Sequence, residues 1–374
     1  MRSGRLVLVC AVLAGLIALL PSKSFAEGPN SASAAVIQGN QGVQDGWVID
    51  DQGNVLFTNA DATLMAQTGA GWVRINFRLG RFKDWTETAT FGYSALSRYD
   101  QVVVNARANG LKVLGLLSNE SWHGYPTDWR ANNAELAKGT GDNRYLLDFA
   151  QQAAVVLVSH FAGRIDWWEV WNEPNVEPTY LYPSNFAWLL GHVYDKTKIA
   201  GVLTARFVSG GVSSLQDANG RLTGASTGAD YLRDTYARGM DRAGWAIFKA
   251  KYGSYPLDGI GQHIYIDGFA RTNGTRIGRA LQLVRDAYLA PEGTNTLKRI
   301  FITEVGWGSN NVSEQVQASN LQTAYTRFKA TPYVHTAFWF SLRDSQAAGL
   351  YFGLLRPNLT QKPSWKAYQS YAVY

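Results

Sequence analysis

The sequence predicts an α/β fold in which short strands alternate with longer helices, and two patterns support this prediction. Apolar runs of strand length recur at residues 35–39, 71–77, 111–117, 165–171, 207–211, 259–266, 299–303 and 334–340. Amphipathic stretches of helical length separate them, such as 58–68, 94–108, 143–161, 183–199, 229–251, 276–288 and 312–330. Eight such units over about 350 residues are typical of a single-domain (β/α)8 TIM barrel. A doubly wound open sheet is the structural alternative, because the first run is the weakest of the eight.

The first 26 residues have the features of an export signal. Arg2 and Arg5 precede an apolar run at 6–20, and the small-residue sequence SFA closes the segment. We therefore expect a signal peptide at 1–26, one domain at 27–374, and a secreted or periplasmic mature protein without a membrane anchor. A transmembrane anchor is the alternative reading, but the apolar run is shorter than the ~20 residues that a span needs.

Composition argues against several classes of function. The one cysteine, Cys10, lies in the expected signal, so the mature chain uses neither disulfides nor thiol chemistry. The chain has 35 basic and 29 acidic residues, and three of the basic residues lie in the signal, which leaves a mature net charge of +3. This charge is too mild to indicate nucleic acid as a partner. The 13 Trp and 19 Tyr residues suit the stacking of aromatic rings on sugars, although a large barrel also buries many aromatic side chains.

Two glutamates are associated with apolar runs of strand type. Glu173 lies near the end of IDWWEVWNEPN at 165–175, and Glu304 follows the apolar residues of RIFITEVGW at 299–307. The carboxyl ends of all strands of a parallel barrel meet at one mouth, so residues distant in sequence can pair there. Paired carboxyl groups suit glycoside hydrolysis, in which one protonates the leaving oxygen and the other attacks the sugar or activates water. A surface glutamate near a loop is the alternative for each residue alone.

The motifs around these glutamates resemble those of a known family. WEVWNEPN at 168–175 and ITEVGW at 302–307 are similar to the two signatures of the retaining glycoside hydrolases of clan A, which includes families 5 and 39. The resemblance extends over nearly the whole mature chain. It implies that Glu173 is the general acid/base after the fourth strand, that Glu304 is the nucleophile at the seventh, and that Asn172 contacts the sugar 2-hydroxyl group.

The resemblance also implies a set of supporting residues. Arg74 in GWVRINF is expected beside the nucleophile, Tyr265 in GQHIYI is expected to bond to it, and Trp339 in AFWF is expected as the platform under the sugar. Two further residues complete the expected substrate-binding set, His263 and Trp307. For His263, a structural histidine that bonds a backbone carbonyl is the alternative. Donation from an arginine and a phenol favours the ionised form of a carboxyl group, as a nucleophile requires.

Other positions depart from the family pattern or are neutral. His123 in LLSNESWHGY does not align securely with the histidine of some clan members, and its neighbours Trp122 and Trp129 are either subsite walls or loop packing. The five histidines lack paired ligand spacing and no calcium-loop motif is present, so neither a metal nor a cofactor is expected.

We therefore expect a monomeric, secreted retaining β-glycosidase whose partner is a carbohydrate. Long loops at 118–140 and 175–184 favour a cleft for a polysaccharide and hence endo action. Two alternatives remain open at this point. One is a transglycosylase that uses the same two glutamates and excludes water, and the other is a non-catalytic carbohydrate-binding barrel.

Overall fold

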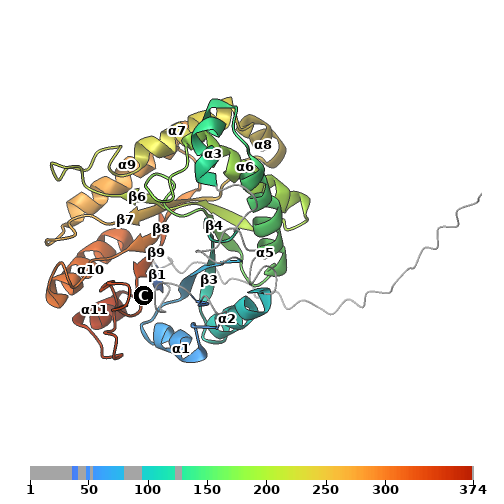
Figure 1. Cartoon of the computed structure of the whole chain (residues 1–374). Helices are drawn as coiled ribbons and strands as arrows, with labels where there is room; N and C mark the ends of the chain where they lie inside the picture. Colours follow the sequence, from blue (N-terminus) through green and yellow to red (C-terminus); the bar gives the residue numbers. More distant parts are fainter. Residues whose placement is uncertain (1–35, 41–47, 51–53, 80–94, 123–128, 373–374) are drawn as a thin grey trace, which may run out of the picture. The chain divides into compact units, whose positions relative to one another are not determined.

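Parallel strands form the wall of a barrel that helices surround (Figure 1). The computed structural model of the 374-residue chain describes residues 36–40, 48–50, 54–79, 95–122 and 129–372. The strands are β1 (Val36–Asn40), β2 (Trp72–Asn76), β3 (Lys112–Leu117), β4 (Trp167–Val170), β5 (Arg206–Ser209), β6 (Val212–Ser214), β7 (Gly259–Ile264), β8 (Arg299–Val305) and β9 (Val334–Phe340). The described barrel lies within one compact unit, Ala34–Tyr374.

The strand order gives the barrel its topology. Hydrogen-bonded neighbours follow the order β1-β9-β8-β7-β5-β4-β3-β2, and all of these pairs are parallel. The two end strands, β1 and β2, lie next to each other, so the barrel nearly closes. The short strand β6 pairs with β7 and continues the direction of β5 after two glycines. All eight expected strand positions and the (β/α)8 barrel are confirmed, and the open-sheet alternative is excluded.

Helices follow the strands and cover the outside of the barrel (Figure 1). They are α1 (Asn59–Gln67), α2 (Leu96–Ala108), α3 (Trp129–Lys138), α4 (Arg144–Asp148), α5 (Val155–His160), α6 (Pro183–Ile199), α7 (Ala229–Asp241), α8 (Trp245–Tyr252), α9 (Gly274–Glu292), α10 (Glu314–Lys329) and α11 (Pro363–Ala372). A π-helical segment, Phe149–Ala154, joins α4 to α5. The single helix expected at 229–251 is instead the pair α7 and α8, because Gly244 takes a left-handed conformation between them.

Helix α3 lies in a region that the sequence analysis assigned to a loop. Its inner face carries Trp129 and Asn133, both buried. Asn133 donates to the carbonyl oxygen of Tyr180 at 2.9 Å and accepts from the side chain of Asn185 at 2.8 Å. The polar Asn133 thus occupies an inner-face position where an apolar residue would be expected, so the helical hydrophobic pattern is absent from this stretch of sequence.

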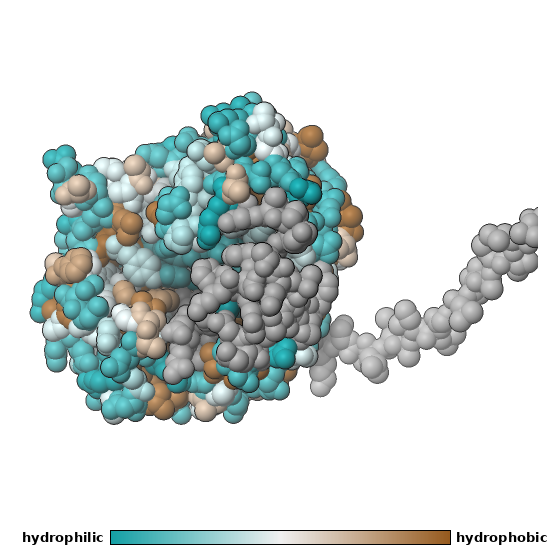
Figure 2. All heavy atoms as spheres, viewed as in Figure 1, coloured by the Kyte–Doolittle hydropathy of each residue, from teal (hydrophilic) through white to brown (hydrophobic). Residues whose placement is uncertain are grey.

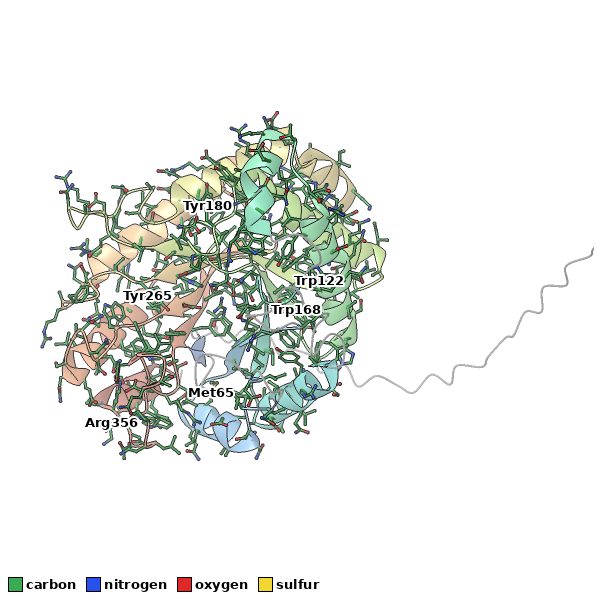
Figure 3. All side chains as sticks on the ribbon, viewed as in Figure 1. Met65, Trp122, Trp168, Tyr180, Tyr265 and Arg356 are labelled. Atoms are coloured by element: carbon green, nitrogen blue, oxygen red, sulfur yellow. The ribbon has the colours of Figure 1, made fainter. Side chains whose placement is uncertain are left out.

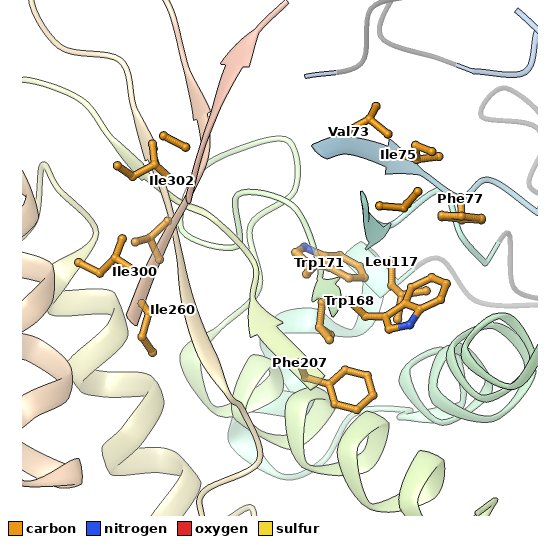
Figure 4. Packing of buried hydrophobic residues seen from close by; sticks show 14 of the residues in the cluster. Val73, Ile75, Phe77, Leu117, Trp168, Trp171, Phe207, Ile260, Ile300 and Ile302 are labelled. Atoms are coloured by element: carbon orange, nitrogen blue, oxygen red, sulfur yellow. The ribbon is translucent and has the colours of Figure 1, made fainter. Parts of the chain in front are cut away.

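The barrel has two apolar layers, one outside and one inside the wall. Val73, Ile75 and Phe77 project from the β2 region into the outer layer, where Trp168 lies near Leu117 (Figure 4). The inner layer is a separate cluster made of Trp72, Leu114, Val208, Phe301 and Phe338, with Trp167 packed against it. Inward-facing residues further along the strands are polar, so the barrel interior changes from apolar to charged toward the carboxyl ends of the strands.

The surface is mainly hydrophilic on the face that Figure 2 shows, where hydrophobic side chains are scattered. Among the described residues, none of the helices combines the length and the apolar character that a membrane crossing requires.

Candidate active site

The two expected catalytic glutamates lie together at the carboxyl ends of β4 and β8. Glu304 belongs to β8, which runs two residues beyond the expected apolar run, and Glu173 comes three residues after β4. One oxygen of each carboxyl group and one ring nitrogen of His263 all lie within 4.8 Å of one another. The side chains of Glu173 and Glu304 keep 25% and 13% of their exposure, so a ligand can reach both.

Arg74 is the buried centre of the site's hydrogen bonds. Its guanidinium group donates from Nε to Glu169 at 2.5 Å, from Nη1 to Glu304 at 2.6 Å and from Nη2 to Asn172 at 2.9 Å. Burial opposes the charge of Arg74, but the adjacent carboxylates raise its pKa. A guanidinium offers five donors in a fixed plane, so one side chain can orient three acceptors at once.

Glu304 receives donors on both of its oxygens. Arg74 donates to Oε1, and the phenol of Tyr265 donates to Oε2 at 2.6 Å. Tyr265 lies beside the end of β7, near β8 (Figure 3). Burial alone would raise the pKa of Glu304, but the positive charges of His263 and Arg74 and the hydrogen bonds from Tyr265 and Arg74 lower it below its ordinary value. The site therefore favours an ionised Glu304.

Tyr265 is held as a proton donor. Burial first, and then the negative charge and hydrogen bond of Glu304, raise the pKa of Tyr265 well above its ordinary value. A phenol that keeps its proton can donate to Glu304 throughout the neutral pH range.

His263 connects the two glutamates. Its Nδ1 lies 2.9 Å from Oε1 of Glu173 and 3.6 Å from Oε2 of Glu304, and its side chain is fully buried. Burial lowers the pKa of His263, but the charges of Glu304 and Glu173 and the hydrogen bond to Glu173 outweigh it and raise the pKa. The partner of Nδ1 is thus a carboxylate, and not the backbone carbonyl of the structural alternative.

The backbone that carries Glu173 is held in an uncommon conformation. Trp171 and Glu173 have φ values of 75° and 45°, in the left-handed region that costs a non-glycine residue about 1–3 kcal/mol. The following loop retains this geometry, because Thr179 Oγ1 donates to the carbonyl oxygen of Glu173 at 3.1 Å and Trp171 Nε1 donates to the carbonyl oxygen of Thr179 at 2.7 Å. Strain of this kind concentrates at functional sites.

Glu169 is a site residue that the sequence analysis missed. It lies on β4, is fully buried, and accepts from Arg74 at 2.5 Å, from the backbone nitrogen of Gly211 at 2.9 Å and from Thr303 Oγ1 at 2.9 Å. Its Oε1 is also 3.9 Å from Nε2 of His263. The signal in the sequence was a charged residue inside the apolar run WWEVW, four positions before Glu173.

Gly211 permits the close packing of this region. A Cβ atom at this position would lie 2.2 Å from Cδ2 of His263 and 2.6 Å from Oγ1 of Thr303. Only a residue without a side chain lets the backbone approach the imidazole ring and donate to Glu169.

The expected roles of Trp339 and Trp307 require correction. Trp339 belongs to the outer apolar cluster, its ring lies 6.4 Å from that of Tyr325 on α10, and its Nε1 donates to the carbonyl oxygen of Phe352. Trp307 is also buried, packs 6.1 Å from Trp339 and donates to the carbonyl oxygen of Ile266. Trp339 points outward because successive strand residues point to opposite sides and Phe338 takes the inner side. Trp307, which follows the end of β8, belongs to the same outer cluster as Trp339.

Phe340 occupies the inward position that was expected of Trp339. It is two residues after Phe338 on β9 and is half-buried. Its ring lies 5.5 Å from that of Phe352, which in turn lies 6.1 Å from Tyr265. The ring of Phe352 therefore lies between those of Phe340 and Tyr265 in a series of aromatic contacts.

The aromatic residues after β3 divide differently. Trp129 is buried and its ring packs edge-on against Trp171 at 5.2 Å, which corresponds to the loop-packing alternative. Trp122 is half-buried and packs against the outer core. His123 lies outside the described residues.

The trio of Glu173, His263 and Glu304 has donor atoms close enough to surround one metal ion. However, Arg74 and Tyr265 already donate to both oxygens of Glu304, and the guanidinium supplies a positive charge at this point. The arrangement therefore suits proton transfer and charge stabilisation more than metal coordination.

Comparison with known proteins gives matches among solved structures only. No family model and no curated protein matches the chain. A family 39 glycoside hydrolase from the gut symbiont Bacteroides cellulosilyticus is 17% identical, with a TM-score of 0.57, over 90% of this chain and 63% of its own. GH5_18 from Streptomyces cattleya is 16% identical, with a TM-score of 0.62, over 90% of this chain and 80% of its own.

The native xylanase 10B of Thermotoga maritima is also similar. It is 16% identical, with a TM-score of 0.55, over 91% of this chain and 95% of its own. The chain shares the barrel fold of these glycoside hydrolases. It spans somewhat less than two thirds of the length of the family 39 enzyme.

Proposed function

We propose that the protein is a retaining glycoside hydrolase, with Glu173 as general acid/base and Glu304 as nucleophile. The observation that carries this proposal is the approach of the two carboxyl groups, whose nearer oxygens lie within 4.8 Å. Retaining enzymes hold these groups about 5–5.5 Å apart, whereas inverting enzymes leave ~6.5–9.5 Å for a water molecule.

In the first step the carboxylate of Glu304 attacks the anomeric carbon. Glu173 donates a proton to the glycosidic oxygen as the bond from that oxygen to the anomeric carbon breaks, and the sugar becomes covalently linked to Glu304. The donors on Glu304, Arg74 and Tyr265, support the ionised nucleophile before attack.

In the second step the carboxylate of Glu173 accepts a proton from a water molecule, and the resulting hydroxide attacks the anomeric carbon. The bond to Glu304 breaks, and the product has the configuration of the substrate. His263 hydrogen-bonds to Glu173 and is placed to orient its carboxyl group in both steps.

Asn172 has a defined orientation that suits a sugar hydroxyl group. Its Oδ1 accepts from Arg74 Nη2 at 2.9 Å, so its amide NH2 group is directed away from the arginine. A donor in this position can bond to the 2-hydroxyl group, an interaction that strengthens in the oxocarbenium-like transition state.

The substrate class that we propose is a β-linked polysaccharide, cleaved in the interior of the chain. Support comes from the long segment 175–182 after β4 and from two proteins with the same fold, xylanase 10B and an endo-β-1,3-glucanase of Amycolatopsis mediterranei. The glucanase is 14% identical, with a TM-score of 0.51, over 90% of this chain and 99% of its own. We also propose that the protein is secreted, on the basis of the basic and apolar pattern at 1–26.

The decisive experiment compares Glu304→Ala with Glu173→Ala on aryl glycosides of different leaving-group ability. Glu304→Ala should lose activity on every substrate, because no glycosyl-enzyme can form. Glu173→Ala should still complete the first step with a dinitrophenyl leaving group, which needs little protonation. Added azide should then give a β-glycosyl azide with Glu173→Ala and the α product with Glu304→Ala.

Two results would contradict this assignment. One is an equal loss of activity in both variants on good and poor leaving groups, with the same azide anomer or none. The other is an inverted anomer as the first product of the wild-type enzyme in an NMR time course.

A further inference from the structure

A hollow lies at the end of the barrel opposite Glu173 and Glu304. It has a volume of about 1000 Å³, and its wall includes Trp167, Arg206 and Arg299, the first residues of β4, β5 and β8. We call it the basal hollow. Glu304 is five residues after Arg299 along β8, so roughly 16 Å separate the two ends at 3.3 Å per residue.

The basal hollow is positively charged. Five basic side chains line it, namely Arg206, Lys249, Arg285, Lys298 and Arg299, against two acidic ones, Asp258 and Glu292. Lys298 forms an ion pair with Glu292, and Asp258 accepts from the backbone nitrogen of Phe207 at 2.8 Å. Within the described part of the chain, neither Arg206 nor Arg299 has a carboxylate within ion-pair distance. Their charges are therefore available to a ligand.

Aromatic rings share the wall with these cations. The guanidinium of Arg206 lies 5.2 Å from the ring of Trp167, and that of Arg285 lies 4.9 Å from the ring of Tyr333. The imidazole of His335 stacks on Phe301 at 4.2 Å with 11° between the planes. Cation–π contact fixes the arginines against the rings.

The pKa of His335 depends on the charges that line the basal hollow. Burial, together with the positive charges of Arg299, Lys112 and Arg206, lowers the pKa of His335 to about 4. An anion bound among these cations would offset their field and raise the pKa of the imidazole.

We propose that the basal hollow binds an acidic oligosaccharide, a short chain of sugars that carry carboxylate groups. Unpaired arginines present forked donors that match carboxylates, and the exposed parts of the half-buried Trp167 and Tyr333 add apolar contact area for sugar rings. The volume is at the upper end of the ~300–1000 Å³ that ligand sites commonly have, which is enough for more than one sugar ring. This site is separate from the proposed catalytic one and does not depend on it.

The two acidic residues of the wall favour a glycan over a nucleic acid. Asp258 and Glu292 can accept hydrogen bonds from sugar hydroxyl groups, and they interrupt the series of cations along the wall. Proteins that bind single strands instead follow the backbone with a continuous basic groove.

The test is calorimetric titration of the mature protein with a hexamer of galacturonic acid at low ionic strength. Wild type should bind, and the double variant Arg206→Gln/Arg299→Gln should bind at least tenfold more weakly. The matched control is Arg279→Gln/Lys366→Gln, which removes the same charge from exposed side chains outside the hollow and should bind as wild type does. In NMR titrations the pKa of His335 should rise from about 4 when the hexamer is present.

Further titrations with other ligands, and a turnover assay, identify the ligand class and the place of binding. A neutral cellohexaose, inorganic phosphate and a six-nucleotide single-stranded DNA should each bind more weakly than the galacturonate hexamer. The proposal is overturned if wild type does not bind the hexamer, if both double variants weaken equally, or if phosphate or DNA binds more tightly. Turnover of an aryl glycoside should be the same in both double variants, because neither changes the mouth of the barrel.

Discussion

Glu169 is the residue whose replacement tests the electrostatics of the site most directly. Its carboxylate is fully buried, and each of its three neighbours donates to it: Arg74, the backbone of Gly211 and the hydroxyl of Thr303. Glu169→Gln keeps the shape but removes the charge. Whichever way the new amide turns, its NH2 group must face at least one donor, so the site cannot be satisfied.

The expected loss of stability follows from the buried ion pair. Removing one partner of such a pair costs about 3–5 kcal/mol, because the other charge is left without compensation. Arg74 retains Glu304 as a second partner, so we expect the lower end, about 3 kcal/mol, in urea unfolding. We also expect kcat/KM to fall about tenfold to a hundredfold, because Arg74 then loses the contact that fixes its guanidinium beside Glu304, the proposed nucleophile.

Two variants make the result interpretable. Glu169→Asp keeps the charge and should recover part of the stability and part of kcat/KM. Glu135→Gln is the matched control, because the ion pair that Glu135 forms with Lys138 on α3 is exposed to solvent. This variant should behave as wild type does. A Glu169→Gln protein with unchanged unfolding free energy and unchanged kcat/KM would refute the positioning role of Glu169.

Three other predictions concern the neighbours of the proposed catalytic pair, Glu173 and Glu304. Gly211→Ala should destabilise the protein by about 1–3 kcal/mol and lower turnover, because the added Cβ would lie 2.2 Å from the ring of His263. Tyr265→Phe removes a donor that lowers the pKa of Glu304, so the acid limb of kcat/KM should move to higher pH. The wild-type limb reflects loss of ionised Glu304 as pH falls through its lowered pKa. Trp339→Ala should cost about 3–5 kcal/mol in thermal or urea unfolding, with KM little changed in the fraction that folds.

Matched variants accompany these predictions. Gly268→Ala has open space around the new Cβ and an ordinary φ, so it should retain wild-type stability and turnover. Phe340→Ala should raise KM more than Trp339→Ala does, while lowering stability less. An unshifted acid limb in Tyr265→Phe, or a larger rise of KM in Trp339→Ala, would be inconsistent with the geometry described above.

The sequence alone predicted the repeating plan of the fold and the approach of Glu173 and Glu304 to each other. Periodic apolar runs determine the strands, because each run must be buried on both faces in a parallel barrel. The motifs around Glu173 and Glu304 distinguish them from surface glutamates, and the barrel plan requires their strand ends to meet. These are local patterns and a topological rule, so they can be read without coordinates.

The tertiary structure decided which side chains face the site. A strand has a period of two, so a change of one residue moves a side chain from the inner to the outer face, and the resemblance could not distinguish Phe340 from Trp339 on this point. Glu169 could not be identified from the sequence for a related reason. Its donors come from distant segments, Arg74 on β2 and Gly211 after β5, which meet β4 only in the folded barrel. The basal hollow likewise brings together the first residues of distant strands, and their spacing follows from the closure of the barrel.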